Sequence, residues 1–103
     1  MRKAEVYFDA ILAGVLIEMD DGKICRFQYE PDYGGPPISL TMPVRQKPYF
    51  FNDFPPFFDG LLPEGFQLEA LVRQKKLDSD DKFGQLLAIG ADTVGAVTIK
   101  RAS

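Results

Sequence analysis

Two carboxylates, Asp59 and Glu64, lie within residues 54–67, the segment of the chain that is densest in aromatic residues, prolines and glycines. A pair of carboxylates can serve as general acid and general base when the two side chains have different environments. The sequence offers neither of them a second catalytic partner. The other acidic runs, Asp20-Asp21 and residues 78–81, have the positions of turn and helix-cap residues. The acidic residues therefore indicate a binding module rather than an enzyme.

The composition excludes chemistry that depends on histidine. The chain has no histidine and one cysteine, Cys25, so it has no histidine base, no histidine metal ligand and no internal disulfide. Cys25 lies in an alternating strand pattern, which predicts a buried structural thiol. The pair Gly34-Gly35 precedes Pro36-Pro37, and prolines lack the amide hydrogens that a phosphate-binding loop donates. We therefore expect no metal and no cofactor.

The length and charge are those of one ordinary globular domain, which we expect to span residues 1–103. The chain is 46% hydrophobic and 26% charged. Its net charge of −3 argues against nucleic-acid binding, which needs a basic patch. The N-terminus lacks an apolar signal core, and no apolar run has transmembrane length. We therefore expect a cytoplasmic protein that binds no membrane and no small-molecule substrate.

The first half of the chain shows the two-residue alternation of β-strands. Strands are predicted at residues 5–8, 11–19, 23–30 and 38–42, and a loop or edge segment at residues 44–52. In the third strand the odd-numbered residues are expected to face the core, and in the fourth Ile38, Leu40 and Met42. Gly14 interrupts the second strand, which predicts a β-bulge or a close backbone approach.

The second half is predicted to be mainly helical. Residues 57–62 suit one or two helical turns, and residues 64–77 suit a helix with Leu68, Leu71 and Val72 on its core face. Residues 78–81 can cap a further helix that ends at Gly90. Residues 93–100, with Val94, Ala96 and Thr98 alternating against Gly95, Val97 and Ile99, are predicted to form a last strand that returns to the same sheet. The expected fold is α+β: a small antiparallel sheet with two helices packed on one side.

Four segments in order resemble the N-terminal subdomain of HipA-type kinases. They are the hairpin and loop at residues 20–33, the proline-bounded segment at 37–43, the Pro-Phe-Phe-Asp-Gly-Leu-Leu-Pro-Glu-Gly run at 56–65, and residues 83–90 with 92–96. The resemblance covers nearly the whole chain. It implies the fold of that subdomain, but the nucleotide loop, the lysine and the catalytic aspartate of the kinase core have no counterpart here. Kinase activity is therefore not implied.

A chain that consists of this subdomain alone is similar to the HipS antitoxins of the bacterial tripartite HipBST toxin–antitoxin systems. That resemblance implies a partner, the HipA-like serine/threonine kinase toxin HipT, which the antitoxin binds and holds inactive. It also implies a third component, the DNA-binding protein HipB. One alternative is a structural or activating subunit that completes the kinase or bridges it to HipB. Another is a small enzyme that depends on carboxylates.

Phe66 is the residue that we expect to anchor the partner. The helix phase set by the leucines places Phe66 opposite the core face, with Glu64, Gly65, Gln67 and Arg73 around it, which is the composition of an interface anchor. The alternative is that Phe66 folds back as a staple against Phe57 or Leu62. Our hypothesis is that the segment from Asp59 to Gln67 enters or covers the active cleft of the kinase. Phe66 would fill the cleft and Glu64 would face a basic phosphate-binding site.

Overall fold

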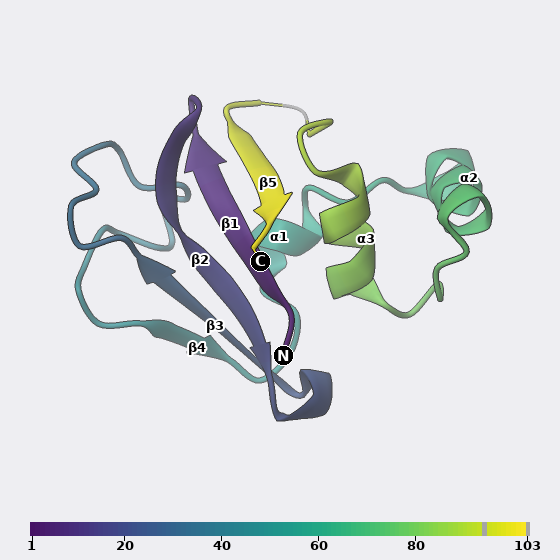
Figure 1. Ribbon diagram of the computed structural model, residues 1–103, viewed down its shortest axis with the longest axis horizontal. Helices are drawn as coiled ribbons and strands as arrows, with labels where there is room; N and C mark the ends of the chain where they lie inside the picture. The colour runs from purple at the N-terminus through teal and green to yellow at the C-terminus, as the bar shows by residue number, and fades with distance from the viewer. Residues whose placement is uncertain (94, 103) are drawn as a thin grey trace.

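Within residues 1–93 and 95–102, which the computed structural model describes, five strands form one antiparallel sheet in the order β4-β3-β2-β1-β5 (Figure 1). The strands are β1 (Lys3–Phe8), β2 (Ile11–Met19), β3 (Ile24–Tyr29), β4 (Tyr49–Phe51) and β5 (Val97–Arg101). The short strand β4 is an edge strand, as predicted for residues 44–52. β5 pairs with β1, so the chain returns to the sheet of the hairpins as expected. Val94, which the sequence placed in this strand, lies outside the described residues.

Local sequence explains the two hairpins. Asp9 and Ala10 both have positive φ angles, 49° and 68°, which is the geometry that closes a two-residue turn between β1 and β2. A short 3-10 turn, η1 (Asp20–Gly22), joins β2 to β3 with a positive φ at every position. The predicted irregularity at Gly14 is confirmed in both forms. The β1–β2 register shifts beside it, and a Cβ atom at Gly14 would overlap the backbone carbonyl oxygen of Gln28 on β3.

The core lies between one face of the sheet and two helices, α1 (Pro56–Asp59) and α3 (Lys82–Ile89). The odd-numbered residues of β3 are buried as predicted, and the ring of Phe27 packs 5.9 Å from that of Phe58 on α1. Helix α3 contributes Phe83 and Leu86. Asp81 caps α3 by accepting a hydrogen bond from the amide of Gly84, and the helix ends at Gly90, both as predicted.

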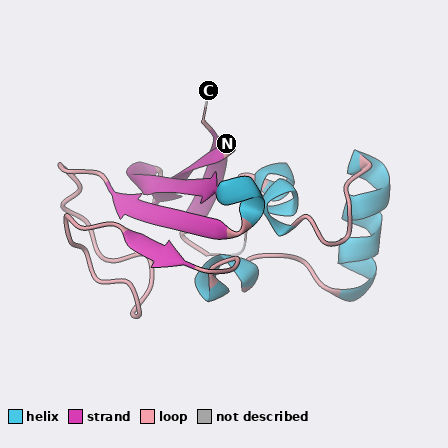
Figure 2. Cartoon of the chain, turned by 90° about the horizontal axis from the view of Figure 1, so that it is seen from below, coloured by secondary structure: helices cyan, strands magenta, loops and turns pink. Residues whose placement is uncertain are grey.

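Helix α2 (Gly65–Lys75) stands apart from the sheet. The α+β fold is confirmed, but only α1 and α3 cover the sheet directly, whereas α2 packs against α3 and buries no residue. In Figures 1 and 2 it lies at the far end of the molecule from the loop that joins β3 to β4. The helix ends before the predicted residue 77 because Lys76 adopts a left-handed conformation. Among the described residues, no helix is both long and apolar enough to cross a membrane.

The predicted strand at residues 38–42 is wrong. Ile38 and Met42 are buried, but the chain reverses between them, and the Leu40 side chain at the tip is 96% exposed. The turn is closed by a hydrogen bond from the Met42 amide to the Ser39 carbonyl, 3.1 Å long. The hydroxyl of Tyr29 anchors both ends, because it accepts from the Ile38 amide and donates to the Met42 carbonyl. The backbone groups are thus satisfied without a neighbouring strand.

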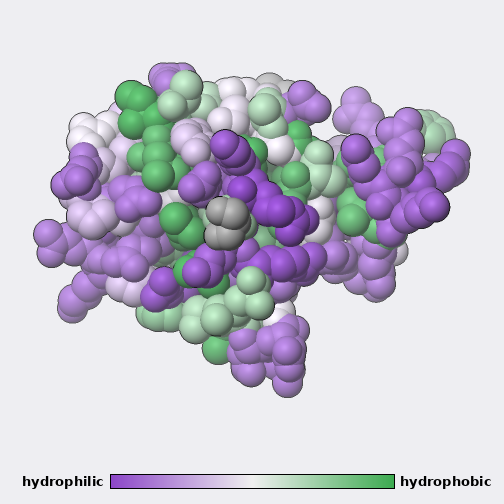
Figure 3. Space-filling view, in the orientation of Figure 1, coloured by the Kyte–Doolittle hydropathy of each residue, from purple (hydrophilic) through white to green (hydrophobic). Residues whose placement is uncertain are grey.

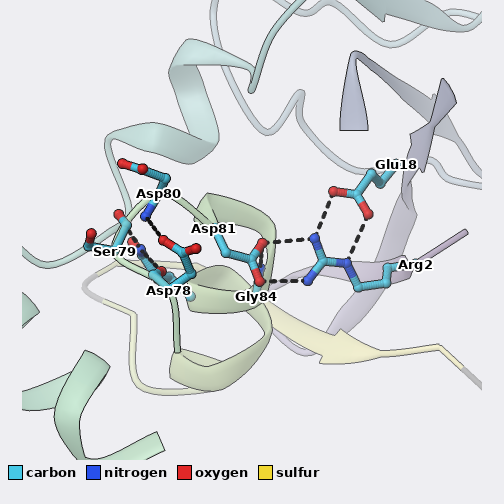
Figure 4. Close-up of polar contacts among 8 residues, drawn as sticks. Arg2, Glu18, Asp78, Ser79, Asp80, Asp81 and Gly84 are labelled. Atoms are coloured by element: carbon cyan, nitrogen blue, oxygen red, sulfur yellow. Dashed lines mark hydrogen bonds and ion pairs between the residues drawn. The ribbon is translucent and has the colours of Figure 1, made fainter. Parts of the chain in front are cut away.

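An ion-pair cluster fixes α3 to the sheet (Figure 4). The Arg2 guanidinium donates to both carboxylate oxygens of Glu18 on β2 and to both of Asp81 at the start of α3, at 2.7–2.9 Å. Its Cζ atom lies 5.2 Å from the centre of the Phe83 ring. These hydrogen bonds, above all those that Arg2 donates to Asp81, raise the pKa of Arg2 above its usual value. The start of α3, and with it the helix that supports α2, therefore has a fixed position relative to the sheet.

Candidate functional site

The start of α2 is shaped by one glycine. Glu64 occupies the N-cap position with extended backbone, its carboxylate makes no capping hydrogen bond, and its carbonyl accepts from the Leu68 amide. Gly65 follows with a φ of +59°, a left-handed conformation that glycine adopts without strain. A Cβ atom at Gly65 would have no neighbour within 4 Å, so the conformation, and not crowding, requires the glycine here. The chain thus turns sharply into the helix and leaves its first side chains in solvent.

Phe66 points into solvent with 89% of its surface exposed. The alternative in which it folds back on Phe57 or Leu62 is therefore wrong. Ala70 and Arg73, four and seven residues further on, lie on the same side of the helix and are also exposed. Leu68, Leu71 and Val72 are half-buried on the opposite side, as the helix phase predicts. In Figure 3 the α2 end is mostly hydrophilic, with apolar atoms on the side that faces α3.

The other site residues predicted from the sequence are exposed as well. Glu64, Gly65, Gln67 and Arg73 all surround Phe66 on α2 or at its start. Asp59 lies apart from them, at the end of α1, where its carboxylate is 3.1 Å from the ammonium nitrogen of Lys82. The structure therefore brings five of the six residues together on one helix and gives the sixth a separate ion pair. Half of the Asp59 side-chain surface remains exposed, so this pair contributes little to stability.

A small hollow beside α2 adds residues that sequence reasoning did not include. It has a volume of about 220 Å³ and lies between the α1–α2 connection, the first turn of α2 and the end of α3. Its described lining is mostly half-buried and apolar and includes Leu61, Leu62, Pro63, Gln67, Ile89 and Asp92. Ile89 and Asp92 are more than twenty residues from Gln67 in the chain, so no local pattern could have associated them.

Cys25 has the properties of a structural thiol. The residue is buried on β3, and burial raises the pKa of its thiol to about 11. The thiolate is therefore scarce at neutral pH, and the residue is a poor nucleophile. Among the described residues, no three histidine, cysteine or acidic side chains are grouped as metal ligands. The site presents an exposed aromatic ring with polar neighbours, a composition that suits contact with a protein partner.

Comparison with known proteins identifies the family. The sequence model described as HipA N-terminal domain matches residues 4–100. The chain belongs to this family. A solved structure, the N-terminal domain of HipA toxin, superimposes with a TM-score of 0.78 at 29% sequence identity and covers 100% of this chain and 94% of its own. The resemblance inferred from the four segments is thus confirmed, and the family domain is the non-catalytic subdomain.

Two relatives differ in how much other sequence accompanies this HipA N-terminal domain. An uncharacterised protein of Haemophilus influenzae is 34% identical over 100 residues, which are 97% of this chain and 92% of that protein. A protein named as a putative kinase, from Sinorhizobium fredii, is 28% identical over 103 residues. That match spans 96% of this chain but 24% of the kinase. The domain therefore occurs both as nearly all of one relative and as a small part of another.

Proposed function

We propose that this chain is an antitoxin that binds a HipA-like serine/threonine kinase of the HipT type and holds it inactive in the bacterial cytoplasm. The observation that carries the proposal is the exposure of Phe66 at the start of a helix that buries no residue. Burial of a large aromatic side chain is favourable, and an exposed one gains that free energy only when it enters a partner's pocket. Family membership supports this class of partner, because a relative that contains this domain is named as a putative kinase.

The charges around Phe66 favour a cleft that binds phosphate. Glu64, next to Phe66, is exposed and its carboxylate makes no capping hydrogen bond to α2. A nucleotide-binding cleft offers positively charged groups and backbone amides to phosphate, and a carboxylate can occupy the same place. We therefore propose that the segment from Glu64 to Gln67 enters the cleft of the kinase, with Phe66 as the apolar anchor. Arg73, two turns along the same side of α2, would lie at the rim.

Growth of cells that express the kinase tests the antitoxin role. The chain is co-expressed with a HipA-like kinase of the HipT type, and restored growth is the expected result. Increased toxicity would instead support the activating subunit, and unchanged toxicity would contradict both roles. A third component such as HipB is tested by adding it to the purified pair, where an antitoxin inhibits the kinase without it.

A matched pair of variants tests Phe66. Phe66→Ala should weaken binding to the purified kinase by about thirtyfold or more, the effect of a central anchor residue. Leu40→Ala is the control, because Leu40 is equally exposed but lies in the loop at the opposite end of the molecule. Its affinity should equal that of the unmodified chain. Equal inhibition by both variants would contradict the anchor but leave the antitoxin role intact.

A further inference from the structure

The hollow beside α2 has the size and lining to receive one side chain. Pockets for small ligands usually have volumes of about 300–1,000 Å³. This one has about 220 Å³, too little for most such ligands. Leu61, Leu62, Pro63 and Ile89 provide apolar walls, and all four are half-buried at the edge of the core. An apolar depression at the edge of an exposed helix suits a projecting side chain of a protein partner.

The polar groups around the hollow favour a positively charged side chain of the partner. Asp92 is exposed and is the one charged residue among the described residues that line the hollow, while Gln67 supplies an amide. Glu64, next in the chain to Pro63, adds a second exposed carboxylate nearby. The carboxylate of Asp59 is already paired with Lys82. Negative charge is thus in excess around the hollow, which favours a cation.

We propose that this hollow receives a lysine or arginine side chain of the kinase, with its aliphatic stem against Leu62 and Ile89 and its charged group at Asp92. Lysine and arginine side chains combine an apolar stem with a charged end, which matches apolar walls beside one carboxylate. This inference rests on the proposed function, because the partner is the same kinase. It adds a second contact to that of Phe66. The chain inserts a side chain into the kinase and receives one from it.

Substitutions at Asp92 test the contact without disturbing the core. The carboxylate is exposed, so Asp92→Asn and Asp92→Lys should leave the unfolding transition unchanged. Calorimetric titration with the purified kinase should show about tenfold weaker binding for Asp92→Asn, and a still larger loss for Asp92→Lys, where two like charges meet. Raising the salt concentration should weaken the unmodified complex more than the Asp92→Asn complex.

Asp32→Lys is the matched control, because Asp32 is also exposed and lies in the β3–β4 loop, at the opposite end of the molecule from α2. It should bind as tightly as the unmodified chain. If Asp92→Lys binds as tightly as Asp32→Lys while Phe66→Ala binds weakly, the hollow receives no cation and the antitoxin role stands. If the unmodified chain does not bind the kinase, both proposals are wrong.

Discussion

The guanidinium of Arg2 and the carboxylate of Asp81 share two hydrogen bonds of 2.9 and 2.8 Å across 79 positions of the chain. The same guanidinium donates to both oxygens of Glu18, so one cation bridges the carboxylates of Glu18 and Asp81. Asp81 also caps α3. The pair therefore connects the first residues of the chain to the helix on which α2 rests.

Removal of this cation should destabilise the fold. Arg2→Met keeps the aliphatic stem but leaves Glu18 and Asp81 without their shared donor. We expect the free energy of unfolding, from urea titration, to fall by about 1–2 kcal/mol, at the lower end for charged hydrogen bonds because the side chains are partly exposed. Arg73→Met on the exposed face of α2 is the control and should change it by less than about 0.5 kcal/mol. An equal loss in both variants would contradict a role for the cluster.

Acid should weaken the same contact. The hydrogen bonds from Arg2 hold the pKa of Asp81 below its usual value of 3.8. A carboxyl group whose pKa is lower in the folded state stabilises the fold above its unfolded pKa, and that contribution is lost as the pH falls through the folded value. Unfolding measured from neutral pH to below pH 3.8 should therefore show a steeper loss in the unmodified chain than in Asp81→Asn. Asparagine keeps the helix cap, so parallel curves would exclude this source of acid sensitivity.

Gly14 should not tolerate a side chain. A methyl group there would lie 2.7 Å from the Phe27 ring and would also overlap the carbonyl oxygen of Gln28, neither of which can move freely. Gly14→Ala should lower the free energy of unfolding by about 1–3 kcal/mol. Gly34→Ala, where a Cβ atom would have no neighbour within 4 Å, should be nearly neutral in the same thermal unfolding assay. Equal melting temperatures for the Gly14→Ala and Gly34→Ala variants would contradict the close approach of the strands at Gly14.

The turn at residues 39–42 buries Ile38 but exposes Leu40, so we expect different losses of stability when each is replaced. Ile38→Ala should cost about 2–5 kcal/mol because Ile38 is buried. Leu40→Ala should cost less than about 0.5 kcal/mol because Leu40 is almost fully exposed. Chemical denaturation of the two variants measures the difference. Similar losses of stability in the two variants would contradict the turn and favour the strand that the sequence pattern predicted.

The end of α2 can be stabilised. Lys76 has a φ of 54°, a left-handed conformation that costs a residue with a Cβ atom about 1–2 kcal/mol. Lys76→Gly should therefore slow hydrogen exchange of the last α2 amides, by up to about tenfold for each 1.4 kcal/mol gained. Gln74→Gly, inside the helix, should do the reverse. Faster exchange in both variants would mean that Lys76 makes a contact that outweighs its strain.

Local sequence signals predicted the hairpins but not the turn at residues 39–42, which depends on the hydroxyl of a residue distant in the chain. The alternation in β3 and the Asp-Gly turn at Gly22 act over a few residues, so the sequence predicted them correctly. The alternation of Ile38, Leu40 and Met42 is equally compatible with a turn whose two ends are buried. The choice depends on Tyr29, nine and thirteen residues away, whose hydroxyl binds both ends. No pattern within residues 38–42 contains that information.

The candidate site shows the same division. The helical phase correctly placed Phe66 opposite the half-buried face of α2. It did not decide between exposure and a fold back onto Phe57, because the positive φ of Gly65 sets the direction in which the helix begins. Nor could it place Asp92 beside Gln67, since that proximity follows from the packing of α2 on α3. The sequence thus predicted which face of α2 is exposed, but not which residues of other elements lie beside that helix.

Helix α2 has a consequence for how such a protein can diverge. A helix that buries no residue can exchange the side chains of its outer face while the core that folds the domain stays the same. Substitutions that change the binding surface then fall at different positions from substitutions that destabilise the fold. Under the proposed function, related chains can acquire different partners through changes on the exposed face of this eleven-residue helix while the sheet stays the same.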